Sequence, residues 1–304
     1  MDLQGRYRGC LLGLAAGDAL GTTLEFTHDP PPIDDIVGGG PFRLQPGQWT
    51  DDTSMALCLA ESLLECDKFD ANDQLERYWR WYRDGHLSST GRCFDIGVTT
   101  RDALERWART SDPYAGSTDA HTAGNGSLMR LAPIPMWFRT DPTALLDAAA
   151  DSSRTTHGAR ESVDACRYYA GLVAGALAGV ARDELLSPRW SPRAGAWQDG
   201  PLTPKIDAIA AGSFKGKARA DIKSGGYVVE SLEAALWGFA QAEDFRHGAL
   251  MVVNLGHDAD TTGAIYGMLA GAYFGVDGIP DRWLQKLALR DTIEGFADRM
   301  AARG

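Results

Sequence analysis

Apolar residues recur along this chain at the spacing of helix faces, and this pattern constrains its fold more than any other feature. Stripes with helical spacing occupy residues 3–14, 55–63, 163–173 and 232–239. Runs that alternate apolar with polar residues, as half-buried strands do, are scarce. The pattern therefore predicts an all-α fold of ten or more helices, with residues 1–304 forming a single compact multi-helix domain.

Residues 258–275 form the most apolar of these segments. Gly263, Gly267 and Gly271 lie four residues apart in it and so share one helix face. Small residues at this spacing let a second helix approach closely, which predicts a buried central helix. Two stretches rich in proline and glycine, residues 28–48 and 187–204, are expected to be functional or mobile loops.

Charge and composition exclude several classes of protein. The net charge is -11, so a broad basic surface for nucleic acid is not expected. No apolar run approaches the ~20 residues of a membrane helix. Five cysteines with no C-x-x-C pair favour neither a disulfide framework nor a zinc site. We expect a cytoplasmic protein without a membrane segment.

Two clusters of acidic and threonine residues precede helical stripes. One is Thr50-Asp51-Asp52-Thr53, and the other runs from His257 to Thr262. Taken alone, each cluster is equally typical of a helix cap, in which one oxygen accepts from free backbone amides. A cap, however, needs one acceptor and not two carboxylates. Carboxylate and hydroxyl oxygens suit Mg²⁺, Mn²⁺ or Ca²⁺, so we predict a binuclear metal site if the two helix starts meet.

Other motifs carry weaker signals. Gly17-Asp18-Ala19-Leu20-Gly21 is typical of a helix end with Gly21 as the C′ glycine, and Glu25 after it is equally typical of a surface residue. The segment Gly124–Arg130 is either a plain turn or a phosphate cradle formed by backbone amides. His157, Asp95 and Tyr227 each have an ordinary structural interpretation when taken singly.

Together and in this order, the motifs resemble the ADP-ribosylglycohydrolase family over about residues 6–285. The segments Phe94–Gly97 and Gly226–Glu230 look most similar to its bacterial dinitrogenase reductase-activating branch, which removes ADP-ribose from arginine. The resemblance implies an orthogonal bundle of helices with two Mg²⁺ or Mn²⁺ ions in a central cleft. The implied substrate is an ADP-ribosylated protein, and the implied product is ADP-ribose.

The resemblance also implies roles for individual residues. One metal would be held by Thr50, Asp51 and Asp52, the other by Asp258 and Thr261, with Asp260 bridging the two. Glu25 would lie beside the metals and Asp95 near the scissile bond, so that Asp95, Glu25 and Asp260 form the catalytic set. The implied substrate-binding residues are Asn125, Gly126, Ser127, Met129 and His157 around the pyrophosphate, and Tyr227 on the adenosine side.

The function expected from these features is metal-dependent hydrolysis of an N-glycosidic ADP-ribosyl-arginine bond. The alternatives are hydrolysis of a serine-linked or other ADP-ribose substrate, a metal-dependent nucleotide phosphoesterase, and an immunity-type protein that binds ADP-ribose or a toxin. The target protein, the native metal, the oligomeric state, the role of residues 187–204 and the order of ring opening and hydrolysis stay open at this point.

Overall fold

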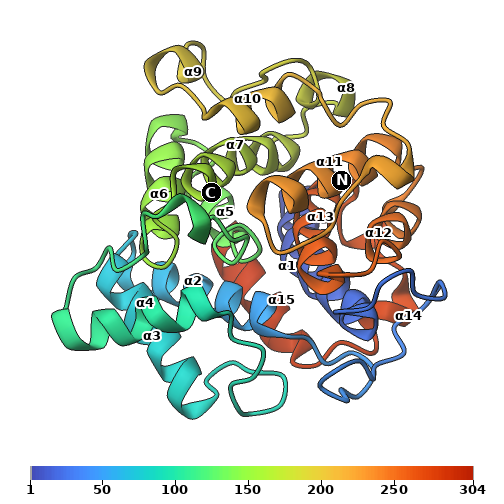
Figure 1. Cartoon of the computed structure of the whole chain (residues 1–304), viewed down its shortest axis with the longest axis horizontal. Coiled ribbons are helices and arrows are strands. Elements are labelled where there is room, and N and C mark those ends of the chain that lie inside the picture. Colours follow the sequence, from blue (N-terminus) through green and yellow to red (C-terminus); the bar gives the residue numbers. More distant parts are fainter. Residues whose placement is uncertain (1, 304) are drawn as a thin grey trace.

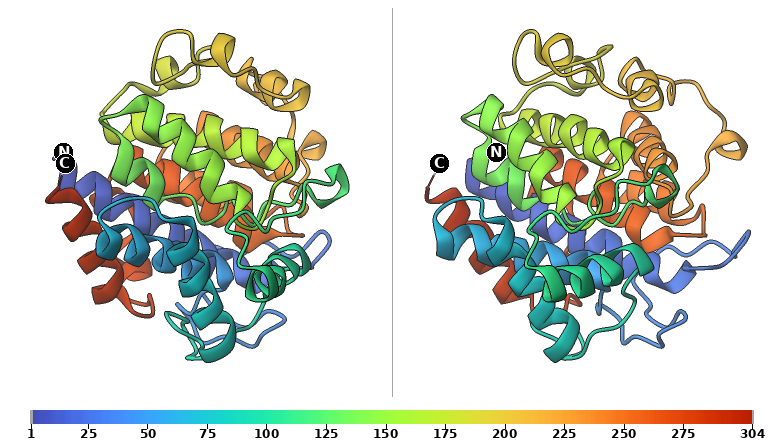
Figure 2. Two further views of the ribbon diagram at one scale, coloured as in Figure 1. Left: turned by 90° about the vertical axis from the view of Figure 1, so that its left-hand side faces the viewer. Right: turned by 60° about the vertical axis from the view of Figure 1, so that its left-hand side comes forward.

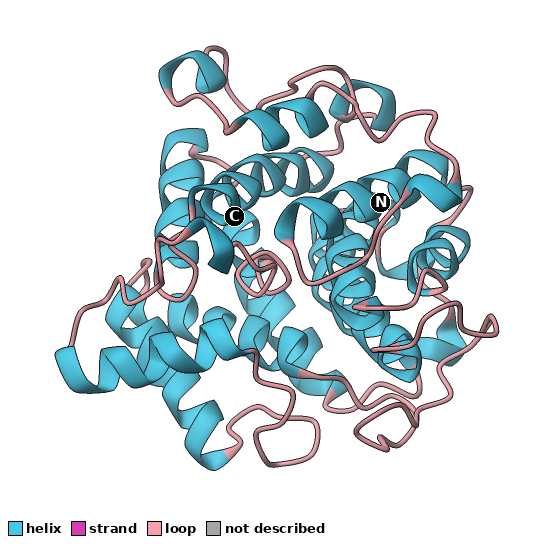
Figure 3. Ribbon diagram, viewed as in Figure 1, coloured by secondary structure: helices cyan, strands magenta, loops and turns pink. Residues whose placement is uncertain are grey.

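The fold is built from helices, as the apolar spacing predicts. A computed structural model describes residues 2–303, and within them fifteen α-helices and four short 3₁₀ helices are joined by loops (Figure 1, Figure 3). Extended pairing within these residues is confined to three isolated bridges, Gly39 with Leu44, Ser117 with His157, and Gly124 with Tyr227. The prediction of an all-α fold is confirmed.

The α-helices are α1 (Leu3–Gly21), α2 (Asp51–Cys66), α3 (Ala71–Asp84), α4 (Val98–Thr110), α5 (Pro133–Phe138), α6 (Pro142–Arg154), α7 (Arg160–Leu177), α8 (Arg182–Leu185), α9 (Ala196–Asp199), α10 (Pro204–Ala210), α11 (Val228–Gln241), α12 (Phe245–Val253), α13 (Ala259–Phe274), α14 (Asp281–Leu284) and α15 (Arg290–Ala301). The 3₁₀ helices are η1 (Thr22–Leu24), η2 (Ala120–Thr122), η3 (Arg219–Asp221) and η4 (Val276–Gly278).

Helices α1 and α13 form an antiparallel pair at the centre of the fold, through glycines on both helices. A Cβ atom added to Gly13 would lie 2.3 Å from the carbonyl oxygen of Gly267, and one added to Gly267 would lie 2.0 Å from that of Gly13. Gly17 and Gly263 are related in the same way. Side chains at these positions would force the backbones apart, so only glycine permits this approach. The predicted buried central helix is therefore present, and its partner is α1.

The end of α1 does not have the C′ glycine that its sequence suggested. Gly21 has right-handed backbone angles, φ -73° and ψ -32°, so it is not a C′ glycine. It continues the glycine face instead, because a Cβ atom on it would lie 2.2 Å from the carbonyl oxygen of Ala259. The carboxyl end of α1 is thereby held against the amino end of α13.

The remaining helices surround this pair. Helices α7, α11 and α12 contact α13, and α15 contacts α1 (Figure 2). In Figure 2, α8–α10 lie at one end of the molecule and α2–α4 toward the other, with α1 and α13 between them. Helix α2 begins beside the junction of α1 and α13, and this meeting of three helix ends positions the site described below.

Residues 187–204 pack against α7. The indole nitrogen of Trp197 donates to the carbonyl oxygen of Trp190 at 3.1 Å. Gly175 of α7 makes room for Trp190, whose ring would lie 2.5 Å from a Cβ atom at that position. The segment leads directly into α10, whose second residue is Lys205. It thus covers α7 and determines where α10 begins.

None of the helices within residues 2–303 combines the length and the apolar character that crossing a membrane requires.

Candidate functional site

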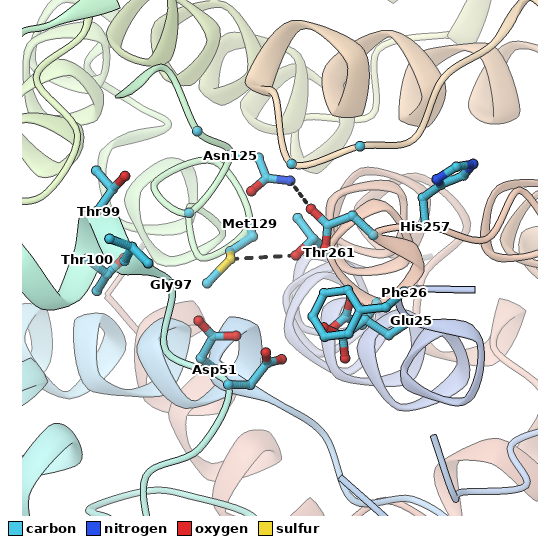
Figure 4. Close-up of a pocket in the computed structure, with 18 of the residues that line it drawn as sticks. Glu25, Phe26, Asp51, Gly97, Thr99, Thr100, Asn125, Met129, His257 and Thr261 are labelled. Atoms are coloured by element: carbon cyan, nitrogen blue, oxygen red, sulfur yellow. Dashed lines mark hydrogen bonds between the residues drawn. The ribbon is translucent and has the colours of Figure 1, made fainter. Parts of the chain in front are cut away.

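A cavity of about 520 Å³ opens where α1 ends and α2 and α13 begin (Figure 4). Ten of the residues predicted from the sequence line it: Glu25, Asp51, Asp95, Asn125, Gly126, Met129, His157, Asp258, Asp260 and Thr261. Thr50, Asp52 and Ser127 are buried behind these residues. Tyr227 instead lines an adjoining cavity of about 600 Å³, which shares Thr99, Gly124 and Gly226 with the first. The structure therefore gathers the dispersed motifs at one place.

The start of α2 is capped from another helix. Asp18 of α1 accepts hydrogen bonds from the Thr53 amide at 3.1 Å, the Thr53 hydroxyl at 2.6 Å, the Thr50 amide at 2.9 Å and the Thr50 hydroxyl at 3.0 Å. No role for Asp18 was predicted, although its place at the end of a glycine-spaced helix was a usable signal. Because Asp18 accepts from the Thr50 and Thr53 amides, Asp51 and Asp52 are not needed for this cap.

The capping alternative fails at both acidic clusters. The residue that precedes α2, Thr50, makes no side-chain cap bond, and neither does Asp258 before α13. Instead, the Thr50 hydroxyl lies 3.1 Å from Asp52 Oδ2 and 3.2 Å from Asp260 Oδ2. The two helix starts therefore meet through their acidic side chains, as the predicted metal site requires.

The carboxylates form two overlapping groups. One oxygen each from Asp18, Asp52 and Asp260 lies within 4.8 Å of the others, and the same holds for Glu25, Asp95 and Asp260. Asp260 belongs to both groups. Glu25 Oε2, Asp52 Oδ1 and Asp260 Oδ1 are buried oxygens without a hydrogen-bond partner in the described part of the chain. Unpaired carboxylate oxygens at this density are a donor set that a divalent cation would satisfy.

Burial and mutual repulsion disfavour the charged forms of these acids. Burial, followed by the charges of Asp95 and Asp258, raises the pKa of Glu25 to about 10. Burial and neighbouring carboxylates raise the pKa of Asp95 to about 8. The pKa values of Asp51, Asp52 and Asp260 are also raised, chiefly by burial. The cluster therefore needs either protons or cations to offset its charge.

These pKa shifts predict that the metal-free protein loses stability as the pH rises. A carboxyl with a raised pKa keeps its proton in the folded state after the unfolded chain has released it. Its contribution to the free energy of unfolding is therefore complete below about pH 4, and it is lost as the pH rises to the pKa of the folded state. For Asp95 and Glu25 that loss extends to about 8 and about 10. We expect the free energy of unfolding in EDTA, measured with urea, to fall by about 4 kcal/mol between about pH 6.5 and about pH 8, about half from each carboxyl.

The acids with lowered pKa values and His157 do not produce this slope. Asp73 and Asp298 have lowered pKa values, so both are ionised throughout the range in either state. Burial lowers the pKa of His157 to about 3, so between about pH 6.5 and about pH 8 only the unfolded chain releases its proton, which opposes the fall by about 0.4 kcal/mol. Saturating Mg²⁺ should remove most of the slope. A flat profile in EDTA would contradict the repulsion described here.

The glycine-rich turn lies beside the carboxylates. The Asn125 side-chain amide donates to Asp258 Oδ2 at 2.7 Å and to Ser231 Oγ at 2.8 Å, so it ties the turn to the start of α13. The Ser127 hydroxyl points inward, where it accepts from Ser153 Oγ at 2.8 Å. Within residues 2–303, the amides of Gly126 and Ser127 have no acceptor. Gly126 also lines the cavity, so a free backbone amide lies at its wall, as in an anion cradle.

Three residues around the cavity have left-handed backbone angles without being glycine. They are Phe26 with φ 57°, Asp95 with φ 60° and His257 with φ 58°. The Phe26 amide donates to the His257 carbonyl at 2.6 Å, which joins two of these positions. Such conformations cost free energy and concentrate at functional sites. Only Asp95 was singled out from the sequence, because nothing in a side-chain pattern reports a left-handed bulky residue.

The adjoining cavity is organised around Tyr227. The Lys205 ammonium donates to the Tyr227 hydroxyl at 2.7 Å and lies 5.0 Å from the ring centroid. The same hydroxyl donates to Glu161. His121, for which the sequence suggested no role, lines this cavity too. The aromatic ring is thus held at the edge of the main cavity by a cation and an anion from two other helices.

The fold and the site together define a class of protein. It is an all-α protein in which the ends of central helices bring buried carboxylates next to a glycine-rich turn. Such carboxylates are donors that divalent cations satisfy. The ADP-ribosylglycohydrolase family model matches residues 1–304, and the chain belongs to this family. The family predicted from the motifs is therefore confirmed.

Similar proteins include named enzymes. The chain is 45% identical over 299 residues to the ADP-ribosylarginine hydrolase Tri1 of Pseudomonas putida (strain GB-1), covering 98% of this chain and 78% of that protein. It is 33% identical over 302 residues to the glycohydrolase of ADP-ribosyl dinitrogen reductase from Rhodospirillum rubrum, covering 95% and 92%. A solved structure described as an ADP-ribosylglycohydrolase-related protein complex matches with a TM-score of 0.86 at 45% identity, covering 99% and 98%.

Proposed function

We propose that this protein is a metal-dependent hydrolase that releases ADP-ribose from modified arginine side chains of proteins. The observation that carries the proposal is the convergence of Glu25, Asp95 and Asp260 beside an amide-lined turn in one cavity. The similarity to an ADP-ribosylarginine hydrolase over 98% of the chain supports the arginine linkage.

Two Mg²⁺ or Mn²⁺ ions are the proposed cofactors. Thr50, Asp51 and Asp52 would hold one ion, Asp258 and Thr261 the other, and Asp260 would bridge them. The unpaired buried oxygens of Asp52 and Asp260 support this donor set. When bound, the ions would orient the ribose hydroxyls and stabilise developing charge. Asp18 is left out of the ligand set because its oxygens already accept four hydrogen bonds.

The turn and its neighbours are the proposed site for the rest of ADP-ribose. The free amides of Gly126 and Ser127 would donate to the pyrophosphate, with His157 and Met129 lining the same space. Asn125 would act by holding the turn against Asp258. Tyr227 would pack against the adenosine in the adjoining cavity.

Asp95 is the proposed acid for the leaving group. Its raised pKa, about 8, means that the carboxyl holds a proton at neutral pH. As the bond between C1″ and the guanidino nitrogen breaks, Asp95 would protonate that nitrogen while water oxygen bonds to C1″. Asp95, ionised by that transfer, would then take the proton that the water loses, and Glu25, whose carboxyl lies in the same group and whose pKa is also raised, would stay protonated beside it. The products are ADP-ribose and unmodified arginine, and Asp95 is returned to its protonated form.

We also propose that the reaction takes place in the cytoplasm of a bacterium. All five cysteines are free thiols, and Cys10, Cys58 and Cys166 are buried. Unpaired thiols are typical of a reducing compartment, which supports this location.

Removal of divalent metal should abolish activity. Oxygen ligands bind Mg²⁺ and Mn²⁺ reversibly, so dialysis against EDTA should stop release of ADP-ribose from an ADP-ribosylated arginine protein, and either ion should restore it. Release is measured by chromatography of the free nucleotide. Full activity after exhaustive chelation would overturn the metal-dependent part of the proposal.

The reaction products test which bond is cleaved, and a comparison of two substrates tests the preference for arginine. Free ADP-ribose identifies glycosidic cleavage, whereas AMP with ribose phosphate would identify a phosphoesterase. Proteins modified separately on arginine and on serine should be compared at equal concentration. Faster release from serine would overturn the proposed linkage preference. Binding of ADP-ribose without release from either substrate would identify a binding protein instead of an enzyme.

A further inference from the structure

Arg130, the last residue of the glycine-rich segment Gly124–Arg130, is a fully buried cation. Its side chain has no exposed surface, and its guanidinium lies 4.7 Å from the Tyr78 ring centroid. Within the described chain, the acceptors of its hydrogen bonds are all neutral. They are the sulfur of Met55, the carbonyl of Ser152 and the hydroxyls of Thr155 and Thr156. A buried charge without an ionic partner is costly, which makes its place beside an anion cradle informative.

The hydrogen bond from Arg130 to Thr156 determines which atom donates in the hydrogen bond between Thr156 and His157. A guanidinium can only donate, so the Thr156 hydroxyl oxygen accepts from Arg130 Nη2 at 2.7 Å. The proton of that hydroxyl is then free to donate to His157 Nδ1, 2.8 Å away. If Nδ1 carried the proton instead, the Thr156 proton would lack an acceptor, since no other partner of this hydroxyl occurs within residues 2–303. The contacts therefore favour an unprotonated Nδ1.

The remaining ring proton then lies on Nε2. Burial and the charge of Arg130 lower the pKa of His157 to about 3, so the ring is neutral and carries one proton. With Nδ1 accepting from Thr156, that proton is on Nε2, and Nε2 is a hydrogen-bond donor.

Nε2 faces the glycine-rich turn. A Cβ atom added to Gly126 would lie 3.1 Å from Nε2, and one added to Gly124 would lie 3.3 Å from it. His157, Gly124 and Gly126 all line the main cavity. The imidazole N–H therefore lies beside the same space as Gly126, whose amide is free, and the two glycines leave room for it.

We propose that Arg130 and Thr156 form a buried relay that keeps His157 in the tautomer with its proton on Nε2, so that the turn presents a fixed N–H donor to the pyrophosphate of ADP-ribose. The inference rests on the proposed function for its ligand. Arg130 and Thr156 are positioning residues, because they act through His157 and do not line the cavity. The buried cation adds a preorganised positive potential beneath the phosphate position.

The tautomer is tested first, on the full-length protein without any ligand. Side-chain nitrogen NMR with ¹⁵N-labelled histidine distinguishes a protonated from an unprotonated ring nitrogen. His157 is assigned among the six histidines by the signal that disappears in His157→Gln. We expect Nε2 to carry the proton and Nδ1 to be unprotonated. A proton on Nδ1 in the wild-type protein would overturn the relay, whatever the enzyme's activity.

Thr156→Val is tested next, because it removes the hydroxyl and keeps the shape of the side chain. We expect its His157 signals to show a mixture of tautomers. We also expect the dissociation constant for ADP-ribose, measured by isothermal titration in Mg²⁺, to rise about tenfold. Thr156→Ser restores the hydroxyl and should restore both the tautomer and the affinity.

Thr155→Val is the matched control. Thr155 is also fully buried and its hydroxyl also accepts from Arg130, at 3.3 Å, but the structure gives it no contact with His157. This variant should share any loss of stability with Thr156→Val and still keep the wild-type tautomer and affinity. An equal loss of ADP-ribose affinity in both variants would show a structural role only and would overturn the relay. Failure of the wild-type protein to bind ADP-ribose would instead overturn the proposed function.

Discussion

Asp52→Asn and Asp260→Asn are each expected to lower turnover by about three orders of magnitude or more while the protein stays folded. Both side chains are buried, and each leaves one carboxylate oxygen without a partner. Asparagine keeps the size of the side chain and removes the charge that a divalent cation needs. Release of ADP-ribose from a modified arginine protein measures the loss, and circular dichroism shows that the helices remain.

The same variants should respond to metal in the opposite sense to the wild-type protein. In EDTA, each substitution removes a source of repulsion, so the melting temperature should stay equal or rise. In Mg²⁺, the wild-type protein should gain more stability than either variant. Asp277→Asn is the control, because it changes an exposed acid beyond the end of α13. Near wild-type turnover in both buried variants would overturn the metal-site assignment.

Asp95→Ala is expected to lose turnover by a factor of about 10²–10⁴ while it still binds ADP-ribose. The arginine nitrogen leaves readily only when it is protonated, and Asp95 is the proposed proton donor. ADP-ribose itself lacks the leaving group, and the turn from Gly124 to Ser127 is untouched. Its dissociation constant, measured by isothermal titration in Mg²⁺, should therefore change by less than about threefold.

A comparison of arginine-linked with serine-linked substrate provides a further test of the role of Asp95. The wild-type enzyme should release ADP-ribose much faster from arginine than from serine, and Asp95→Ala should lose most of that preference. Asp102→Ala, an exposed acid on the neighbouring helix α4, is the control. Normal turnover of Asp95→Ala on the arginine substrate would leave Asp95 as a strained structural acid. Loss of ADP-ribose binding in this variant would show that Asp95 shapes the cavity and does not act on the leaving group.

The fold class followed from local sequence patterns, but the contact at its centre did not. Helical spacing reports which face of a helix is apolar, and the glycines of residues 259–274 correctly indicated a close partner. The partner, α1, carries its own glycines at the same spacing. Which two helices pair depends on tertiary contacts between distant parts of the chain, and periodicity within one segment holds no information about them.

The sequence indicated which residue types lie near one another at the candidate site, but not the contacts that their side chains make. The acidic clusters were expected to meet, and Asp52 and Asp260 do lie together. The side chains of Asn125 and Ser127, both implied to lie around the pyrophosphate, bind Asp258 and Ser153. Side-chain direction in a turn depends on backbone angles and on neighbours from other helices. The cap that Asp18 provides to α2 was missed for the same reason, because its donors lie on another helix.

The pairing of α1 with α13 also governs when the site can exist during synthesis. These helices are separated by residues 22–258, which a ribosome adds in about 12–50 s at 5–20 residues per second. Throughout that interval the glycine face of α1 has no partner, and the proposed cation ligands Thr50, Asp51 and Asp52 are made well before Asp258, Asp260 and Thr261. The nascent chain therefore acquires the two halves of the proposed donor set at different times. We expect a translation product that stops before Asp258 to be inactive, because it lacks one of these halves.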